Sequence, residues 1–468
     1  MAASAAPPLL ADATRRLATF AAELRFADPP AAVVSQAKLS LLDGIGVCLH
    51  GATLPWTRLV QAMVLAEGAA PAASVWATGR RASLAQAALA NATAGHAFEM
   101  DDIHKESVLH PNSLTTPVAL GFAEAHGAAA VMGQDALAAI VAGVEVGARI
   151  GNAATTALFL NGFHPQGTTG VFAAAATAGR LAGLDADRMR HALGIAGSMA
   201  AGLMAAQEGA MVKRLHAGRA AESGVRAADL AARGFTGVED VLEAPYGGFL
   251  SSFARRPEPE RLVAGLGEHW ETLKVGFKMY PSVTSIHSAL DALRHLMAVH
   301  GLGAEEVERI EVGCGHMTFV HTAWPYRPAG VTAAQMNMFY GLSVVALGGD
   351  ASAADYREER LADPAVLGFI PRIAVREDPE IEAMGPVFRH ACRLTVRTKD
   401  GRALRHEVLH RRASPENPVT PAEVEAKFRS VTRGILGDAE AELVVDLVSR
   451  LEALEDLSPL TAILGAER

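Results

Sequence analysis

Clusters of histidines, acids and lysines interrupt an otherwise apolar, glycine-rich sequence. Histidine changes charge near neutral pH, so it can take or give a proton, and lysine can hold a carboxylate. The first cluster spans residues 96–113 and includes Glu99, Asp102, His104 and His110. We interpret it as a site loop. The alternatives are a metal site, because mixed histidine and carboxylate ligands suit zinc, iron or manganese, and a solvated loop.

Two further clusters combine histidine with basic residues. His164 lies in the glycine- and threonine-rich loop 162–170, just before a predicted helix. Lys213, Arg214 and His216 stand at the start of another predicted helix. The start of a helix is already positive, so cations are unfavourable there unless an anion is bound. The alternative is that these are surface charges.

The fourth cluster contains Lys278 and His287. Lys278 could clamp a carboxylate. His287 lies on a helical pattern with the apolar residues Ile286, Leu290 and Leu293, which by itself favours a core histidine. Together the four clusters supply cations for a multiply anionic substrate and histidines for acid–base chemistry.

The elements that position these residues are mostly helices. Helical patterns cover residues 56–68, 83–96, 115–130, 135–150, 168–182, 185–206 and 216–234. After about residue 262 the pattern changes: VERIEVGCG alternates like a strand, and Asp400-Gly401 joins two alternating runs as in a β-hairpin. We therefore expect a mainly α protein with a large all-helical domain, 1–264, and a smaller α+β domain, 265–404. The helical segment 405–468 is expected to pack back on the first domain.

Composition narrows the class of protein. The chain has 468 residues and a formal net charge of −9, which makes nucleic acid and anionic membranes poor partners. Three widely spaced cysteines and no CxxC pair argue against a disulfide framework or a zinc ribbon. The first residues do not resemble a secretory signal, and the longest charge-free stretch, 151–179, contains polar residues that a bilayer would not tolerate. We expect a cytoplasmic protein with no membrane association.

Several stretches carry a family resemblance: HAFEMDDIHKESVLHP, GFHPQGTTGVFAAAATAGRLAGLD, MVKRLHAGRAAESGVRAADLAARGFTGVEDVLEAPYGGF and KVGFKMYPSVTSIHSALDAL. They resemble, in the same order, the 2-methylcitrate dehydratase (MmgE/PrpD) family, which includes cis-aconitate decarboxylase and iminodisuccinate epimerase. The resemblance implies a helical domain with a smaller α+β lid, a homodimer, and catalysis without metal or other cofactor. It further implies His110, His164 and Lys213 as catalytic residues. The substrate-binding residues would be Glu99, Asp102, His104, Lys278, His287 and Tyr340.

The sequence departs from the family pattern at three positions. The usual Asp-Phe-Asp-Asp-Thr-His is Glu99-Met-Asp-Asp-Ile103-His here, so one acid is longer and a hydroxyl is lost. Val283 stands where the decarboxylases have a histidine and many other members a cysteine. Valine cannot transfer a proton or donate a hydrogen bond, which disfavours decarboxylation of the usual kind.

The function expected from these residues is a cofactor-independent hydro-lyase acting on a small hydroxy di- or tricarboxylate such as 2-methylcitrate. Proton removal beside a carboxylate creates an enolate-like anion, which Lys213 and Lys278 would stabilise while His110 and His164 move protons. An epimerase or isomerase is the first alternative, because it begins with the same deprotonation, and a decarboxylase of cis-aconitate type is the second. Alternatives from other classes are a metal-dependent hydrolase and a non-catalytic carboxylate-binding protein.

Overall fold

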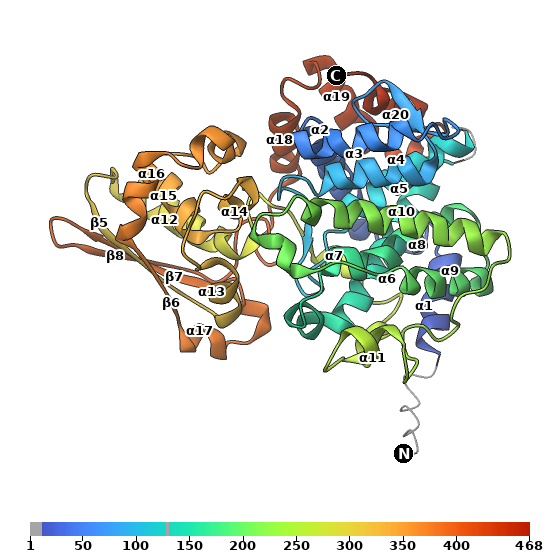
Figure 1. Ribbon diagram of the computed structural model, residues 1–468, viewed down its shortest axis with the longest axis horizontal. Coiled ribbons are helices and arrows are strands. Elements are labelled where there is room, and N and C mark those ends of the chain that lie inside the picture. The colour runs from blue at the N-terminus through green and yellow to red at the C-terminus, as the bar shows by residue number, and fades with distance from the viewer. Residues whose placement is uncertain (1–11, 128–130) are drawn as a thin grey trace.

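The structure is a computed structural model that describes residues 12–127 and 131–468. The chain forms two units that lie side by side (Figure 1). We call the larger one the helical unit and the smaller one the sheet unit. The start of the chain, on which the absence of a signal segment was judged, lies outside the described residues up to residue 11.

The helical unit begins with eleven helices and four short strands among the described residues. They are α1 (Ala13–Glu23), α2 (Ala31–Ala52), α3 (Pro55–Ala66), β1 (Ala73–Val75), β2 (Arg80–Ala82), α4 (Leu84–Gly95), β3 (Ile103–His104), α5 (Asn112–His126), α6 (Gly133–Leu160), α7 (Pro165–Thr168), α8 (Gly170–Leu181), α9 (Ala186–Ser198), α10 (Val212–Ala232), α11 (Phe249–Phe253) and β4 (Val275–Gly276).

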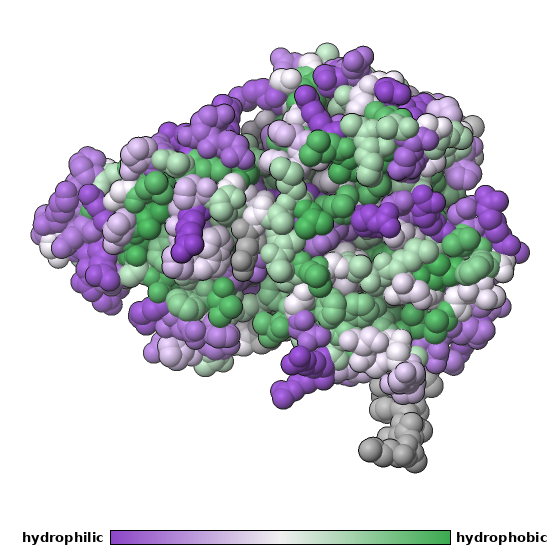
Figure 2. Space-filling model, in the orientation of Figure 1, coloured by the Kyte–Doolittle hydropathy of each residue, from purple (hydrophilic) through white to green (hydrophobic). Residues whose placement is uncertain are grey.

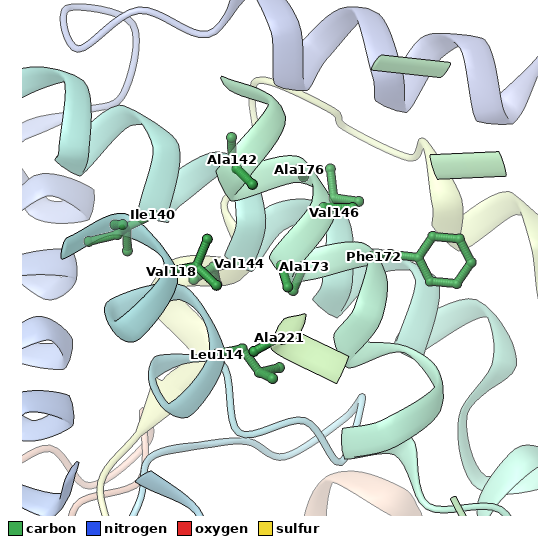
Figure 3. Close-up of a cluster of buried hydrophobic side chains, with 14 of the residues drawn as sticks. Leu114, Val118, Ile140, Ala142, Val144, Val146, Phe172, Ala173, Ala176 and Ala221 are labelled. Carbon is green, nitrogen blue, oxygen red and sulfur yellow. The ribbon is translucent and has the colours of Figure 1, made fainter. Parts of the chain in front are cut away.

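Small residues let the central helices approach closely. Figure 3 shows apolar side chains of α5, α6, α8 and α10 meeting in one cluster, among them Leu114, Val144 and Phe172. On α10, a Cβ added at Gly224 would lie 2.5 Å from the Cβ of Ala174 on α8, so no larger residue fits there without movement. This dense packing holds the helix starts that carry the polar clusters.

Each predicted helix corresponds to an observed one, but several bounds differ. The helix α6, expected over 135–150, continues to Leu160, and α10, expected over 216–234, begins at Val212. The pattern over 115–130 corresponds to α5, which ends at His126, and residues 128–130 lie outside the described residues. The expected helix over 185–206 is wrong beyond Ser198, where α9 ends. Gly202 has φ +139°, a conformation that glycine tolerates, and its carbonyl accepts a hydrogen bond of 3.0 Å from the backbone N–H of His164. The segment after α9 therefore supports the His164 loop instead of extending the helix.

The sheet unit contains a four-stranded mixed sheet in the order β6-β5-β7-β8. Its elements are α12 (Thr284–His300), β5 (Val307–Cys314), α13 (His316–Thr322), α14 (Val331–Gln335), α15 (Met338–Ala346), α16 (Pro364–Phe369), β6 (Ile373–Glu377), α17 (Pro379–Ala383), β7 (Cys392–Thr398) and β8 (Ala403–Val408). β5 and β6 are parallel, and the other two pairs are antiparallel. The predicted strand is β5 and the predicted hairpin is β7–β8, so both predictions are confirmed.

Three further helices follow the sheet unit and return to the helical unit: α18 (Pro421–Thr432), α19 (Asp438–Ser449) and α20 (Ser458–Gly465). Figure 1 shows them in red beside the blue α2, and apolar side chains such as Phe428 and Leu460 belong to the core of the helical unit. Lys427 of α18 also forms a buried ion pair of 2.6 Å with Asp43 of α2. The mainly α fold with a smaller α+β part is confirmed, and the domain boundaries at residues 264 and 404 stay a prediction.

Two helices, α2 and the first 22 residues of α6, are long and apolar enough to cross a membrane by length and composition. In the fold, 67% of the α2 window and all of the α6 window are buried, as in core helices. Figure 2 shows hydrophilic and hydrophobic residues interspersed over the visible face. The prediction of no membrane association stays a prediction.

Candidate active site

A cavity lies where the two units meet, and both units line it. The helical unit and the loop before α12 supply five of its eleven polar lining residues, and the sheet unit supplies the other six. The lining residues are Glu99, Ile103, Val108, His110, Phe159, His164, Met204, Lys213, Lys278, Val283, Thr284, Ser285, Met317, Thr318, His321, Met336, Arg389 and His390. The volume is about 50 Å³, enough for a few water molecules. Five of the nine predicted site residues meet here, namely Glu99, His110, His164, Lys213 and Lys278.

Glu99 lies at the centre of a buried ion cluster. Its carboxylate accepts hydrogen bonds from Lys213, from Arg214 and, at 3.0 Å, from Lys278. Burial by itself would raise the pKa of Glu99, but the two lysines and the arginine hold this pKa well below its usual value. Burial, only partly opposed by Glu99, lowers the pKa of Lys213 to about 8. The cluster therefore keeps a lysine ammonium at the cavity wall, close to its titration range.

This ion cluster also explains the basic residues at the start of α10. Lys213 and Arg214 lie in the first turn, where the helix dipole disfavours cations. Both side chains are buried, so the alternative of surface charges is wrong. The anion that such a position requires is provided by Glu99. The alternative of a solvated loop for residues 96–113 is also wrong, because its three histidines and all of its acids except Glu106 are buried.

His110 is oriented by the backbone. Its Nδ1 lies 2.6 Å from the carbonyl oxygen of Asp102, and because a carbonyl only accepts, Nδ1 carries the proton. Burial lowers the pKa of His110 to about 3, so the ring is neutral at pH 7 and its Nε2 is unprotonated. Gln166 fixes the backbone of His110 through hydrogen bonds of 2.9 and 3.1 Å. His110 therefore offers a base from a rigid position.

His164 is held by another histidine. Its Nδ1 lies 2.9 Å from Nδ1 of His216, so one of these two nitrogens carries the shared proton. Burial and the charge of Lys213 put the pKa of His164 well below its usual value. Between His164 and His110 lies His96, whose ring centre is 5.5 and 5.0 Å from theirs and whose Nδ1 contacts Asp101 at 2.7 Å. The site thus contains three neighbouring imidazoles whose rings are tilted to one another, and burial lowers the pKa of each.

Two cavity residues have a backbone conformation that side chains rarely adopt. Glu99 has φ +56° and Val108 has φ +53°. A β-branched residue such as Val108 is especially unfavourable there. Strained backbone of this kind is typically found at functional sites. The strain places the Glu99 carboxylate and the Val108 side chain in the cavity wall.

The other four predicted residues do not line the cavity. Asp102 accepts a hydrogen bond of 3.0 Å from the backbone N–H of Asn112, and burial raises the pKa of Asp102 well above its usual value. His104 bonds Ser107 and Glu271. His287 Nε2 contacts the carbonyl of Ser282 at 3.1 Å, and the Tyr340 hydroxyl donates to the carbonyl of Asp355 at 2.6 Å. Asp102 supports His110 through its carbonyl, whereas Tyr340 lies in the core of the sheet unit.

Sequence reasoning missed the cavity residues of the sheet unit, notably His321, Arg389 and His390. His321 lies on α13, within an unremarkable helical turn. Arg389 and His390 precede β7, and the alternating pattern there indicates only a strand. The sequence around these three residues gave no signal, because position along the chain does not reveal which residues are neighbours in the fold. Only the adjacent pair of Arg389 and His390 at a strand entry could have marked the place.

One group of side chains has the spacing of a metal site. Ligand atoms of His96, Asp101 and His110 lie within 4.8 Å of one another, and all three residues are buried. However, Lys278 Nζ lies only 3.8 Å from Asp101 Oδ1, and His110 Nδ1 already donates to Asp102. A divalent cation would have to displace that hydrogen bond and face the lysine charge. The donor set therefore fits a metal poorly.

Lysines and histidines of lowered pKa line the cavity between the two units, which makes it a candidate acid–base site. Comparison with known proteins gives the family. The MmgE/PrpD N-terminal domain matches residues 15–262 and the MmgE/PrpD C-terminal domain matches residues 280–452. The chain belongs to the MmgE/PrpD family, as the sequence motifs predicted.

Several curated relatives carry names that specify a reaction. A cis-aconitate decarboxylase-like protein, oryM, from Aspergillus oryzae is 32% identical over 97% of both chains. A cis-aconitate decarboxylase from Aspergillus terreus is 30% identical, over 97% of this chain and 96% of its own. The cis-aconitate decarboxylase from Homo sapiens is 27% identical, over 92% of this chain and 90% of its own. These relatives favour the decarboxylase alternative over the dehydratase that the sequence analysis ranked first.

Proposed function

We propose that this protein is a cofactor-independent decarboxylase of a small unsaturated polycarboxylate, cis-aconitate or a close analogue. The observation that carries the proposal is the placement of Lys213 and Lys278 on the same cavity as the neutral imidazoles of His110 and His164. Relatives named for this reaction match almost the whole chain, which supports it further.

Decarboxylation of cis-aconitate needs cations that stabilise a negative charge, and it needs one proton. When the carboxylate on the methylene carbon leaves as CO₂, the electrons of the broken C–C bond move into the adjacent double bond system. They form a dienolate that is conjugated with the remaining carboxylate. Lys213 and Lys278 are placed to stabilise this added negative charge in a site with little water. A proton delivered to the vinylic carbon completes the product, and the balance is one proton consumed and one CO₂ released.

His164 is the proposed proton donor, and His110 can accept a hydrogen bond only from a water molecule or from a protonated carboxyl group of the substrate. His110 Nδ1 donates to the Asp102 carbonyl, so its Nε2 has only a lone pair to offer. His164 shares its Nδ1 proton with His216, and when His216 donates, His164 Nε2 carries the proton into the cavity. Because a neutral imidazole that gives up this proton must be reprotonated, we propose that the ammonium of Lys213, whose pKa is about 8, replaces it and is left as a neutral amine. Proton transfer by a positioned side chain typically contributes about 10²–10⁴-fold in rate.

A hydro-lyase acting on a hydroxy acid is the second candidate. The unprotonated Nε2 of His110 favours it, because dehydration begins by removing a proton from carbon whereas decarboxylation requires no base. Val283 supports it as well, since the cavity has no hydrogen-bonding side chain at that position. The same base would serve an epimerase.

Proton NMR in D₂O distinguishes these candidates. Purified protein is incubated with cis-aconitate, 2-methylcitrate, citrate and hydroxy- or amino-dicarboxylates. New methylidene signals from cis-aconitate, with CO₂ released, are the expected result. Vinyl or allylic signals from a hydroxy acid would replace the decarboxylase with the hydro-lyase, and deuterium exchange without a new alkene would indicate an epimerase. No change with any acid would contradict all three.

The remaining predictions concern the environment of the protein. We propose that it is a cytoplasmic enzyme that acts as a homodimer on a small carboxylate substrate, without nucleic acid or membrane partners. The buried, unpaired cysteines Cys48, Cys314 and Cys392 are compatible with a reducing compartment. Sedimentation equilibrium of the purified protein tests the dimer, and a monomer across the micromolar range would contradict it.

A further inference from the structure

Arg389 stands out in the sheet unit as a cavity cation without an acidic partner. Within residues 12–127 and 131–468, no carboxylate lies within 4.0 Å of its guanidinium. One of its nitrogens donates to the carbonyl of Lys105, and its Nε is buried without a hydrogen-bond partner among those residues. Burial lowers the pKa of Arg389 to about 10, only partly opposed by Glu106. Glu106 is the acid whose charge acts on the pKa of Arg389, but its carboxylate oxygen Oε2 lies 3.7 Å from Nζ of another cation, Lys274.

The two other cations that line the cavity, Lys213 and Lys278, each have a carboxylate partner within the protein. Lys213, Arg214 and Lys278 all contact the Glu99 carboxylate. Arg389 is half-buried and its Nε is fully buried, so the lack of an acidic partner is unfavourable, because the desolvation of the guanidinium is not repaid. The position of Arg389 becomes favourable once an anion enters the cavity that it lines.

The place of Arg389 is fixed from two sides. Thr318 donates a hydrogen bond of 2.7 Å to the backbone carbonyl of Arg389. Lys105, in the loop that follows β3, donates to the carbonyl of Val387 at 2.8 Å and accepts from the Arg389 side chain. The guanidinium is thus held at the boundary between the two units.

We infer that Arg389 binds a second carboxylate of the substrate, across the cavity from Lys213 and Lys278. The substrate is therefore a polycarboxylate with at least two carboxylates that the two units hold separately. This inference rests on the proposed function and deepens it, because it assigns a recognition group to the sheet unit. A planar guanidinium suits this role, since it can donate two parallel hydrogen bonds to one carboxylate.

Binding of unreactive acids tests the inference without turnover. Calorimetry compares tricarballylate, which has three carboxylates on a saturated chain, with glutarate and succinate, which each lack one of them. In R389Q, tricarballylate is expected to bind about tenfold to a hundredfold more weakly. The dicarboxylate that lacks the carboxylate held by Arg389 should change less than about threefold. R389K should lose less than R389Q, because it keeps the charge but not the planar fork.

Several outcomes would overturn the inference. R389Q could bind tricarballylate as tightly as the wild type, or all three acids could weaken equally, which would indicate a structural role. A wild type that binds none of the acids would also overturn it. R405Q, on the exposed strand β8, is the control and should leave binding unchanged. If R389Q fails to fold, R389K with the same three acids gives the answer. Wild-type binding without release of CO₂ from cis-aconitate would contradict the proposed function but leave the Arg389 assignment standing.

Discussion

The polar side chains that line the two sides of the cavity differ in how far the protein itself satisfies them. On the helical side, Glu99 contacts three cations, and His110 and His164 each have a hydrogen-bond partner. On the sheet side, Arg389 Nε, His390 Nδ1 and His321 Nε2 are buried without a partner in the described part of the chain. Behind the lining of the helical side, His96 Nε2, Asp101 Oδ1 and Arg214 Nε are also buried without a hydrogen-bond partner in the described part of the chain. The helical side is preorganised for proton chemistry, whereas the sheet side is complete only when a ligand is present.

The largest effect is expected from removing a cation on the preorganised side. K213M should lower kcat/KM for the substrate by about a thousandfold, because the dienolate loses its nearest ammonium. The variant should remain folded, since Arg214 and Lys278 still neutralise Glu99. Steady-state kinetics and circular dichroism check both points. A loss below tenfold would contradict the role of Lys213, and K399M, at the tip of the β7–β8 hairpin, is the matched control.

Replacing one histidine on each side of the cavity tests whether the two sides differ in role. H164A should lower kcat by about a hundredfold or more, because the proposed proton donor is removed. H321A, which changes a histidine of the sheet side, should act mainly on KM. Steady-state kinetics and thermal unfolding of both variants provide the measurement. Near-normal turnover by H164A would refute the donor assignment, and equal losses of kcat in both variants would show that the two sides do not differ in role.

The pH dependence of kcat/KM should follow the titration of Lys213, on the helical side of the cavity. Burial lowers the pKa of Lys213 to about 8, so its ammonium is present below that pH and is lost above it. We expect kcat/KM to be constant near neutrality and to fall about tenfold per pH unit at higher pH, because this parameter follows the free enzyme. K213R, if active, should lose this alkaline limb, since arginine stays charged. A wild-type profile that is flat up to pH 10 would contradict the assignment.

The smallest effect is expected at the contact between the units. The cavity volume of about 50 Å³ is smaller than a tricarboxylate, so its wall must shift when a substrate of that size enters, and the contact between the units is one place where this shift is expected. Lys105 links them through Val387 and, at 2.6 Å, through Glu416. K105A should change KM by about threefold with little effect on kcat, as expected for a partly exposed ion pair. Kinetics of K105A beside K399A measure this, and an effect on kcat larger than on KM would argue against a closing contact.

Much of the fold could be predicted from the sequence because periodicity reports which face of each element is buried. The α4, α10 and β7–β8 assignments depend on such local patterns. The pairing of Glu99 with Lys213 was not predictable, since 114 residues separate the partners and either could have been a surface charge. Arg389 was out of reach for a similar reason. An alternating strand pattern does not reveal which residue just before the strand faces the other unit.

The fold-back of α18 has a consequence for how the protein is made. Asp43 and Lys427 meet in the core of the helical unit, together with the Met100 carbonyl that Lys427 also binds at 2.7 Å. The core of the helical unit is therefore completed only after the ribosome has synthesised the whole sheet unit. Contacts this distant in sequence are slow to form. We expect nascent chains that stop before residue 421 to expose apolar faces of α2 and to depend on chaperones.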